Sequence, residues 1–234
     1  MPRLRPSVSR LEERGTTVFD STVKQELIRY GKKLVEAGLT KGTGGNLSVY
    51  DHENGLMAIT PSGIDFFEIR EQDIVTLDAK GNVVDGDRSP SSEWQMHLET
   101  YLDRPELNAV IHAHTTYATA LAVLRQPLRA THYMVAVAGK DVRVADYATY
   151  GTPELAHNAV KAMKDRRAVL LANHGILAGA QDLLNAFNII EEVEYCAKVY
   201  CIAKSVGDPV VLPDEEMALM HEKFKTYGQR KSQA

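Results

Sequence analysis

The sequence has few cysteines, no long apolar run and no excess of positive charge, and each shortage excludes a class of protein. Its two cysteines, Cys196 and Cys201, lie on one predicted helix where they would rarely pair, so they form no disulfide framework. No apolar run approaches the ~20 residues that span a bilayer. The formal net charge of −4 argues against nucleic acid or an anionic membrane as a partner. We expect a soluble, cytoplasmic protein.

A length of 234 residues suits one medium-sized domain that can bury a full hydrophobic core. Residues 1–20 are charged, lack a regular hydrophobic pattern and contain no apolar segment like that of a signal peptide. We expect them to form a flexible N-terminal arm, either native or left over from cloning. Residues 21–234 then make up the folded domain.

Hydrophobic periodicity divides residues 21–234 into helices and strands. Ser92, followed three residues later by Gln95, has the form of a capping box and predicts the start of a helix. Because helices and strands alternate irregularly, the pattern indicates an α/β domain with one sheet covered by helices. Helices are predicted near 21–38, 92–102, 115–124, 153–164, 182–207 and 214–227, and strands near 47–49, 56–60, 74–77, 109–113, 142–145, 168–172 and 176–178.

The most informative motif is His112-Ala113-His114, at the end of the apolar run 109–111. Side chains alternate along a strand, so both imidazoles point to one side and are close enough to share a metal ion. A third histidine, His174, ends another apolar strand. Three histidines with an open fourth position are typical of a catalytic zinc site. The competing interpretation is that these are polar residues at strand ends or in a turn.

Two residues of the predicted helix at 92–102 extend this candidate site. Glu93 is a candidate metal ligand or general base. His97 lies one helical turn after Glu93, and it either supports the metal ligands or simply packs in the core. The sequence leaves both interpretations of His97 open.

Three segments have the chemistry of an anion site. Residues 90–94 place two serine hydroxyls and free backbone N–H groups at a helix start, which favours a phosphate. The glycines of 42–46 let the backbone approach a ligand closely, and 60–63 add a hydroxyl in a turn. Each segment alone is better explained as ordinary helix capping or a turn.

Taken in chain order, these motifs resemble those of the class II aldolase/adducin family. The resemblance extends over about residues 22–228 and rests on the ordered set rather than on one motif. The matching segments are Gly-Thr-Gly-Gly-Asn-Leu-Ser (42–48), Thr-Pro-Ser-Gly (60–63), Pro-Ser-Ser-Glu-Trp (90–94), His-Ala-His (112–114), His-Tyr-Met (132–134), His-Gly (174–175) and Glu-Lys-Phe-Lys-Thr-Tyr-Gly (222–228).

The resemblance implies a central β-sheet with helices on both faces, and a homotetramer with fourfold symmetry whose active sites lie at subunit interfaces. It also implies one Zn²⁺ per subunit, with Glu93 as a fourth ligand or as the base. The three implied histidine ligands are His112, His114 and His174.

The resemblance further implies a substrate site for a sugar phosphate. Tyr133 and Tyr227 correspond to tyrosines that reach the active site from the neighbouring subunit. The implied phosphate-binding residues are Gly45, Asn46, Ser62, Gly63, Ser91 and Ser92.

For activity, the resemblance implies zinc-dependent retro-aldol cleavage of L-fuculose 1-phosphate, or a similar ketose 1-phosphate, to dihydroxyacetone phosphate and L-lactaldehyde. The nearest alternative is a pentulose-phosphate 4-epimerase of the same family, acting on L-ribulose 5-phosphate. Such epimerases carry aspartate in place of Glu93 and lack the tyrosine at 133, so both residues favour the aldolase. A dehydratase acting on a thio-sugar phosphate shares the fold. A non-catalytic adducin-like scaffold should have lost the metal ligands.

Two positions depart from the family pattern. Lys140 stands where a second glycine is expected after Gly139, and Asn173 stands where a histidine is expected. Neither belongs to the implied ligand set, so both bear on substrate preference rather than on the reaction itself.

Overall fold

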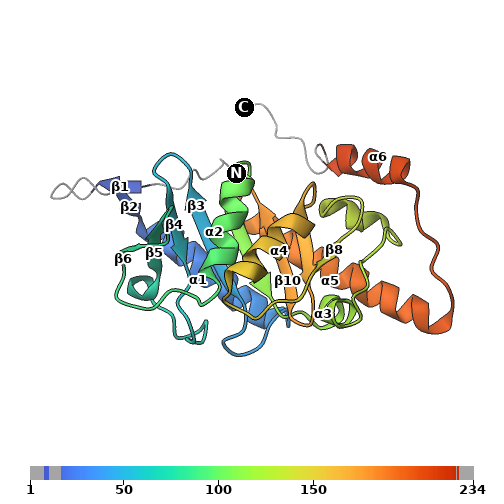
Figure 1. The fold of residues 1–234 in the computed structure, drawn as a ribbon, viewed down its shortest axis with the longest axis horizontal. Helices are drawn as coiled ribbons and strands as arrows, with labels where there is room; N and C mark the ends of the chain where they lie inside the picture. Colours follow the sequence, from blue (N-terminus) through green and yellow to red (C-terminus); the bar gives the residue numbers. More distant parts are fainter. Residues whose placement is uncertain (1–7, 11–16, 225, 227–234) are drawn as a thin grey trace, which may run out of the picture.

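The computed structural model describes residues 8–10, 17–224 and 226, and its centre is an eight-stranded sheet. The strand order is β6-β5-β4-β3-β7-β10-β9-β8 (Figure 1). Neighbouring strands are antiparallel except for β8 and β9, which are parallel. The strands are β3 (Asn46–Asp51), β4 (Leu56–Ile59), β5 (Val75–Asp78), β6 (Val83–Asp85), β7 (Ala109–Ala113), β8 (Arg143–Ala145), β9 (Ala168–Leu171) and β10 (Gly175–Ala180).

Helices cover both faces of this sheet. One face packs against α2 and α4, which lie side by side (Figure 1), and the other packs against α1, α3 and α5. The predicted α/β class, with one sheet between helices in a single domain, is confirmed. The helices are α1 (Ser21–Glu36), α2 (Trp94–Asp103), α3 (Thr116–Val123), α4 (Pro153–Met163), α5 (Leu183–Val206) and α6 (Asp214–Phe224), with short 3₁₀ turns η1 (Glu71–Asp73) and η2 (Tyr133–Val137).

Strand β7 shows how the sheet divides the core in two. Ile111 and its alternate neighbours Ala109 and Ala113 pack with α1, α3 and α5, whereas Val110 packs on the side of α2 and α4. Side chains alternate along a strand, so His112 also projects toward the α2 side. The fully buried position of His112 therefore follows from the register of β7.

The start of α2 differs from the sequence prediction. Glu93 is the N-cap residue, and no side chain caps this helix end, so the predicted capping box of Ser92 and Gln95 is wrong. Instead, the hydroxyl of Ser91 accepts a 3.3 Å hydrogen bond from the backbone N–H of Glu93. The sequence pattern also gave no indication of β6, η1 or η2, which are three, three and five residues long.

The predicted N-terminal arm falls partly on residues 1–7 and 11–16, which lie outside the described ranges. Of the rest, β1 (Val8–Arg10) and β2 (Thr17–Phe19) pair in antiparallel fashion, and Phe19 is buried in the core. Among the described residues, no helix combines the length and apolar character needed to cross a bilayer.

Candidate active site

Adjacent strands bring the three predicted histidines together at one end of the sheet. His112 lies in β7, beside Leu177 of β10, and His114 follows that strand directly. His174 lies in the turn between β9 and β10, where Asn173 adopts a φ of +53° that asparagine tolerates better than most residues. The metal-binding atoms of the three histidines all lie within 4.8 Å of one another.

Glu93 completes this cluster from the start of α2. Its Oε2 lies 3.3 Å from His112 Nε2, and its Oε1 lies 3.4 Å from His174 Nε2. Asn46 donates a 2.9 Å hydrogen bond to Oε2. Oε1 is buried and has no hydrogen-bond partner among the described residues. A buried carboxylate with one unpartnered oxygen, next to three imidazoles, fits a bound divalent cation.

The protonation of this cluster also fits a metal ion. Nδ1 of His112 lies 2.9 Å from the carbonyl oxygen of Ile176, so Nδ1 carries the hydrogen and Nε2 presents its lone pair. Burial lowers the pKa of His112 to about 3, and it also lowers the pKa of His114. Burial by itself would raise the pKa of Glu93, but the neighbouring imidazoles and the hydrogen bond from Asn46 bring it below its ordinary value. Neutral imidazoles and a carboxylate are the forms that bind zinc.

A cavity of about 420 Å³ opens beside this cluster. Glu93, His114 and His174 form part of its wall. The cavity is also lined by every residue of the sequence-predicted phosphate set, namely Gly45, Asn46, Ser62, Gly63, Ser91 and Ser92. The cavity is thus lined by a carboxylate and two imidazoles, and also by loops that contribute hydroxyls and glycine backbone.

Four further residues line the cavity: Thr43, Gly44, Pro61 and Tyr150. The first three belong to segments that the sequence had already indicated, but Tyr150 was missed. Tyr150 lies close to the cavity because the next residue, Gly151, packs on the loop before α2. A Cβ added to Gly151 would lie 2.9 Å from the Ser92 carbonyl oxygen. No local sequence motif around Tyr150 predicts this contact.

Glycine is required where the loop 42–46 meets the histidine strand. Gly45 has a φ of +80°, and a Cβ there would lie 2.6 Å from the carbonyl oxygen of His112. A Cβ on Gly44 would lie 2.9 Å from His114 Nδ1. The absence of side chains therefore lets this loop lie directly against His112 and His114.

Tyr133, which the structure describes, does not line the cavity of its own chain. Tyr133 opens η2, is 48% exposed, stacks on His132 and lies 6.3 Å from the ring of Phe224 in α6. It is not among the residues that line the cavity. Tyr227 lies outside the described residues.

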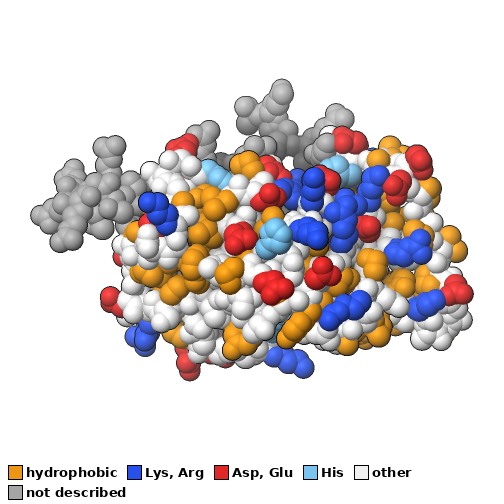
Figure 2. Space-filling view, in the orientation of Figure 1, with side chains coloured by type: hydrophobic (Ala, Val, Ile, Leu, Met, Phe, Trp, Pro, Cys, Tyr) orange, Lys and Arg blue, Asp and Glu red, His pale blue; other side chains and the backbone are white. Residues whose placement is uncertain are grey.

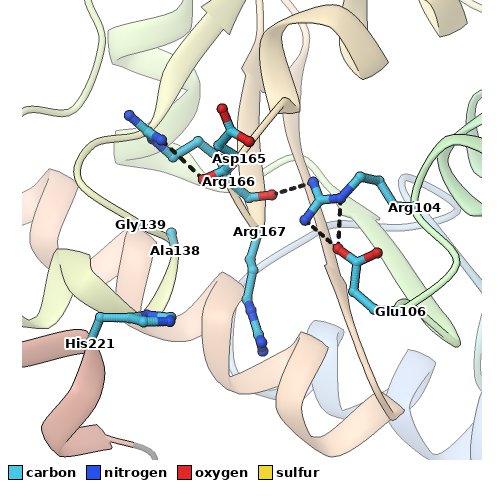
Figure 3. A pocket seen from close by; sticks show the side chains of 8 residues that line it. All are labelled: Arg104, Glu106, Ala138, Gly139, Asp165, Arg166, Arg167 and His221. Atoms are coloured by element: carbon cyan, nitrogen blue, oxygen red, sulfur yellow. Dashed lines mark hydrogen bonds and ion pairs between the residues drawn. The ribbon is translucent and has the colours of Figure 1, made fainter. Parts of the chain in front are cut away.

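A second cavity, of about 220 Å³, lies at the opposite end of β9 from His174 (Figure 3). Two of its guanidinium groups are already paired, Arg104 with Glu106 and Arg166 with Asp141. Figure 2 likewise shows Lys and Arg side chains mixed with Asp and Glu on that face of the molecule. The histidine cluster that could hold a metal ion lies beside the first cavity, and two of its members, His114 and His174, line that cavity.

Comparison with known proteins agrees with this site. The family described as Class II Aldolase and Adducin N-terminal domain matches residues 25–201. The 5-deoxy-D-ribulose 1-phosphate aldolase of Bacillus thuringiensis serovar kurstaki is 48% identical over 207 residues, which are 88% of this chain and 97% of the relative. The 5-methylthioribulose-1-phosphate/5-deoxyribulose-1-phosphate aldolase of Rhodospirillum rubrum is 44% identical over 207 residues, 88% of this chain and 92% of the relative.

A solved structure of an L-fuculose 1-phosphate aldolase is 76% identical to this chain. It superimposes with a TM-score of 0.87 and covers 88% of this chain and 97% of its own. The chain belongs to the class II aldolase and adducin N-terminal domain family, as the sequence motifs predict. Within that family it is a metal-dependent aldolase, and the aldolases of this family act on sugar phosphates.

Proposed function

We propose that this protein cleaves a ketose 1-phosphate between C3 and C4 and releases dihydroxyacetone phosphate and an aldehyde. The observation that carries the proposal is the convergence of three imidazoles and Glu93 beside a cavity that is also lined by serines and glycine turns. The first group suits a metal ion, and the second suits the phosphate of the substrate.

The two proposed phosphate-binding segments, 60–63 and 90–94, are joined by backbone hydrogen bonds. The N–H of Ser62 donates to the carbonyl oxygen of Ser89 at 3.1 Å, and the N–H of Ser91 donates to that of Thr60 at 3.1 Å. This pairing holds the segments that carry Ser62 and Ser91 next to each other, and both residues line the cavity. Binding energy from the phosphate can then orient the reacting carbons toward Glu93.

His112, His114 and His174 are the proposed Zn²⁺ ligands, with Glu93 as a fourth ligand or as the base. A bound Zn²⁺ supplies a Lewis acid that stabilises the negative charge left on the dihydroxyacetone phosphate fragment when C3–C4 breaks. No lysine is found among the described residues that line the cavity, so a Schiff-base mechanism has no amine there.

The proposed role of Glu93 is to hold the proton that is transferred at C3 of the substrate. Its Oε1 faces the cluster without a hydrogen-bond partner in the described part of the chain, so it is free to carry that proton. We assign Tyr133 of a neighbouring subunit, together with Tyr227, to the oxygen at C4, which becomes the aldehyde oxygen. Both then stabilise the aldehyde half of the reaction.

We infer a homotetramer with active sites between subunits. Tyr133 is half exposed and does not line its own cavity, which supports a role in a neighbouring one. Large apolar side chains are exposed near the end of α5 and beyond it, including Val206 at 86% and Val210 at 83%. Light scattering should give a mass of about four times 25.9 kDa, and a monomer would contradict the inference.

A substrate panel tests the proposed function. Metal-replete protein is incubated with L-fuculose 1-phosphate, 5-deoxy-D-ribulose 1-phosphate or 5-methylthioribulose 1-phosphate, and dihydroxyacetone phosphate is measured by a coupled dehydrogenase. These substrates share the dihydroxyacetone phosphate half and differ in the aldehyde. Release of dihydroxyacetone phosphate from at least one of them is expected, and we propose L-fuculose 1-phosphate as the first to test.

Adding L-ribulose 5-phosphate to this panel tests the main alternative. The epimerase would convert L-ribulose 5-phosphate to its isomer and release no free aldehyde. The presence of Glu93 and Tyr133 favours the aldolase over this reaction. Isomer formation without cleavage of any ketose 1-phosphate would overturn the proposed function in favour of the epimerase.

A further inference from the structure

The face of α2 that packs on the sheet carries a row of polar side chains in the core. Glu93, His97 and Tyr101 follow one another at intervals of four residues, so they share one face of the helix. Opposite them, β3 carries Asn46 and Ser48, which are two residues apart and therefore on one face of the strand. His97, Ser48 and Tyr101 are all 0% exposed.

These five side chains form a continuous line of hydrogen bonds. Asn46 Nδ2 donates to Glu93 Oε2 at 2.9 Å, and His97 Nε2 lies 2.5 Å from Asn46 Oδ1. Ser48 Oγ lies 2.7 Å from His97 Nδ1 and 2.8 Å from the hydroxyl of Tyr101. That hydroxyl also donates to the carbonyl oxygen of Ser48 at 2.9 Å. The line thus begins at Tyr101 and ends at the Glu93 carboxylate.

The direction of every donor in this line is fixed from the Glu93 end. A carboxylate only accepts, so Asn46 turns its amide NH₂ to Glu93 and its carbonyl oxygen to His97. His97 must then carry its hydrogen on Nε2, and as a neutral ring it accepts at Nδ1 from the hydroxyl of Ser48. The remaining hydroxyl proton, on Tyr101, points to the oxygens of Ser48. Burial lowers the pKa of His97 to about 4, which keeps the ring neutral near pH 7.

We propose that His97 is a positioning residue that acts through Asn46 to hold Oε2 of Glu93 in place and leave Oε1 free. The proposal rests on the proposed function, because it assumes that Glu93 works as ligand or base. Without the hydrogen on His97 Nε2, no donor holds the carbonyl oxygen of Asn46. The reversed amide would then place its oxygen against the Glu93 carboxylate, where two acceptors repel each other.

Two substitutions of His97 and one matched control test this. His97→Phe removes both ring nitrogens, whereas His97→Gln keeps an amide donor close to the position of Nε2. Thr100→Val is the control, because Thr100 is equally buried on α2 and its hydroxyl donates to the Met96 carbonyl oxygen of its own helix. The measurements are kcat and KM for ketose 1-phosphate cleavage, together with thermal unfolding to confirm the fold.

The kcat of His97→Phe should fall about 10–100-fold with KM little changed, as is typical when a group behind a metal ligand is removed. His97→Gln should recover most of that loss, and Thr100→Val should keep the wild-type kcat. If His97→Phe and Thr100→Val have the same kcat, His97 has only a packing role. Failure of the glutamine variant to exceed the phenylalanine variant, with both folded, would also overturn the proposal.

Two measurements on the metal-free protein separate this proposal from the proposed function. Nitrogen-15 NMR should show His97 neutral at pH 7 with its hydrogen on Nε2. Zinc titration should give an affinity about 10–100-fold weaker for His97→Phe than for Thr100→Val. If the wild type cleaves no ketose phosphate, the proposed function fails while these two results still decide the role of His97. A hydrogen on Nδ1, or equal zinc affinities, would refute the positioning role.

Discussion

Oε1 of Glu93 lies 3.4 Å from Nε2 of His174. Among the described residues, this buried oxygen has no hydrogen-bond partner. The other oxygen is held by Asn46. The carboxylate is thus fixed on one side and open on the other. This asymmetry is what a base or a replaceable metal ligand needs, because it must move a proton without losing its position.

Glu93→Gln should keep zinc and lose most turnover. Three histidines remain to bind the ion, but an amide cannot carry the proton, so kcat should fall by about 100-fold or more. Metal analysis and steady-state kinetics check the two halves of this prediction. Glu99→Gln is the matched control, because Glu99 lies on α2 and does not line the cavity. A wild-type rate in Glu93→Gln would refute the assignment of the base.

Tyr133→Phe should slow cleavage about 10–100-fold and spare the fold. The ring of Tyr133 stacks on His132, and phenylalanine preserves that contact. Tyr147→Phe, which changes another exposed tyrosine, should leave the rate unchanged.

Mixed oligomers test whether Tyr133 acts on a neighbouring subunit. Tyr133→Phe and Glu93→Gln subunits, refolded together, would form some sites in which both residues are native. Activity above that of either parent is therefore expected. If mixing gives only the average of the two parents, Tyr133 works within its own subunit or has no catalytic role.

The stability of the metal-free protein should fall as the pH drops from about 6.5 to 4. Burial holds the pKa of His97 at about 4, below its ordinary value near 6.5. In that interval the unfolded chain binds a proton that the folded chain excludes, so acid favours unfolding. The contribution of His97 is roughly 3 kcal/mol, fully present above pH 6.5. Urea unfolding of His97→Gln should show a shallower pH dependence than the wild type, and identical slopes would contradict this.

Gly45→Ala should weaken both the fold and zinc binding. Alanine at a φ of +80° is strained, and its Cβ would press on the carbonyl oxygen of His112 at 2.6 Å. The combined cost should be about 2–4 kcal/mol. Gly38→Ala is the control, because its φ is +69° but nothing lies within 4 Å of an added Cβ. Equal losses of stability in the two variants would show that the contact with His112 has no effect.

Much of this site could be predicted from local sequence rules. Strand alternation placed His112 and His114 on one side of a strand, and the end of another apolar strand indicated His174. The structure brings all three within 4.8 Å. The proximity of the three side chains could be predicted because the side-chain period of a strand and the position of its end are both local properties of the sequence.

Other features depend on contacts that no local rule describes. Tyr150 reaches the cavity through the packing of Gly151 on Ser92. The capping-box pattern of Ser92 and Gln95 failed because Glu93, whose side chain faces the histidines, occupies the N-cap position. Each of these depends on tertiary packing, which overrides local preference at a functional site.

A local signal for the polar line was present but incomplete. The spacing Glu93, His97, Tyr101 matches one helix face, and Asn46 with Ser48 matches one strand face. Only the pairing of α2 with β3 shows that these two faces meet. The sequence therefore left the role of His97 open, and the structure supplies the contacts from which we infer it.

We propose that His112, His114 and His174 hold the metal ion on which aldol cleavage depends. The most direct test measures bound zinc and dihydroxyacetone phosphate release in the same samples of the wild type and of His114→Ala. Both quantities are measured before a chelator is added, after it is added, and after zinc is restored. We predict that the wild type loses both with the chelator and regains both with zinc, whereas folded His114→Ala has neither. Undiminished cleavage by zinc-free protein would contradict the account.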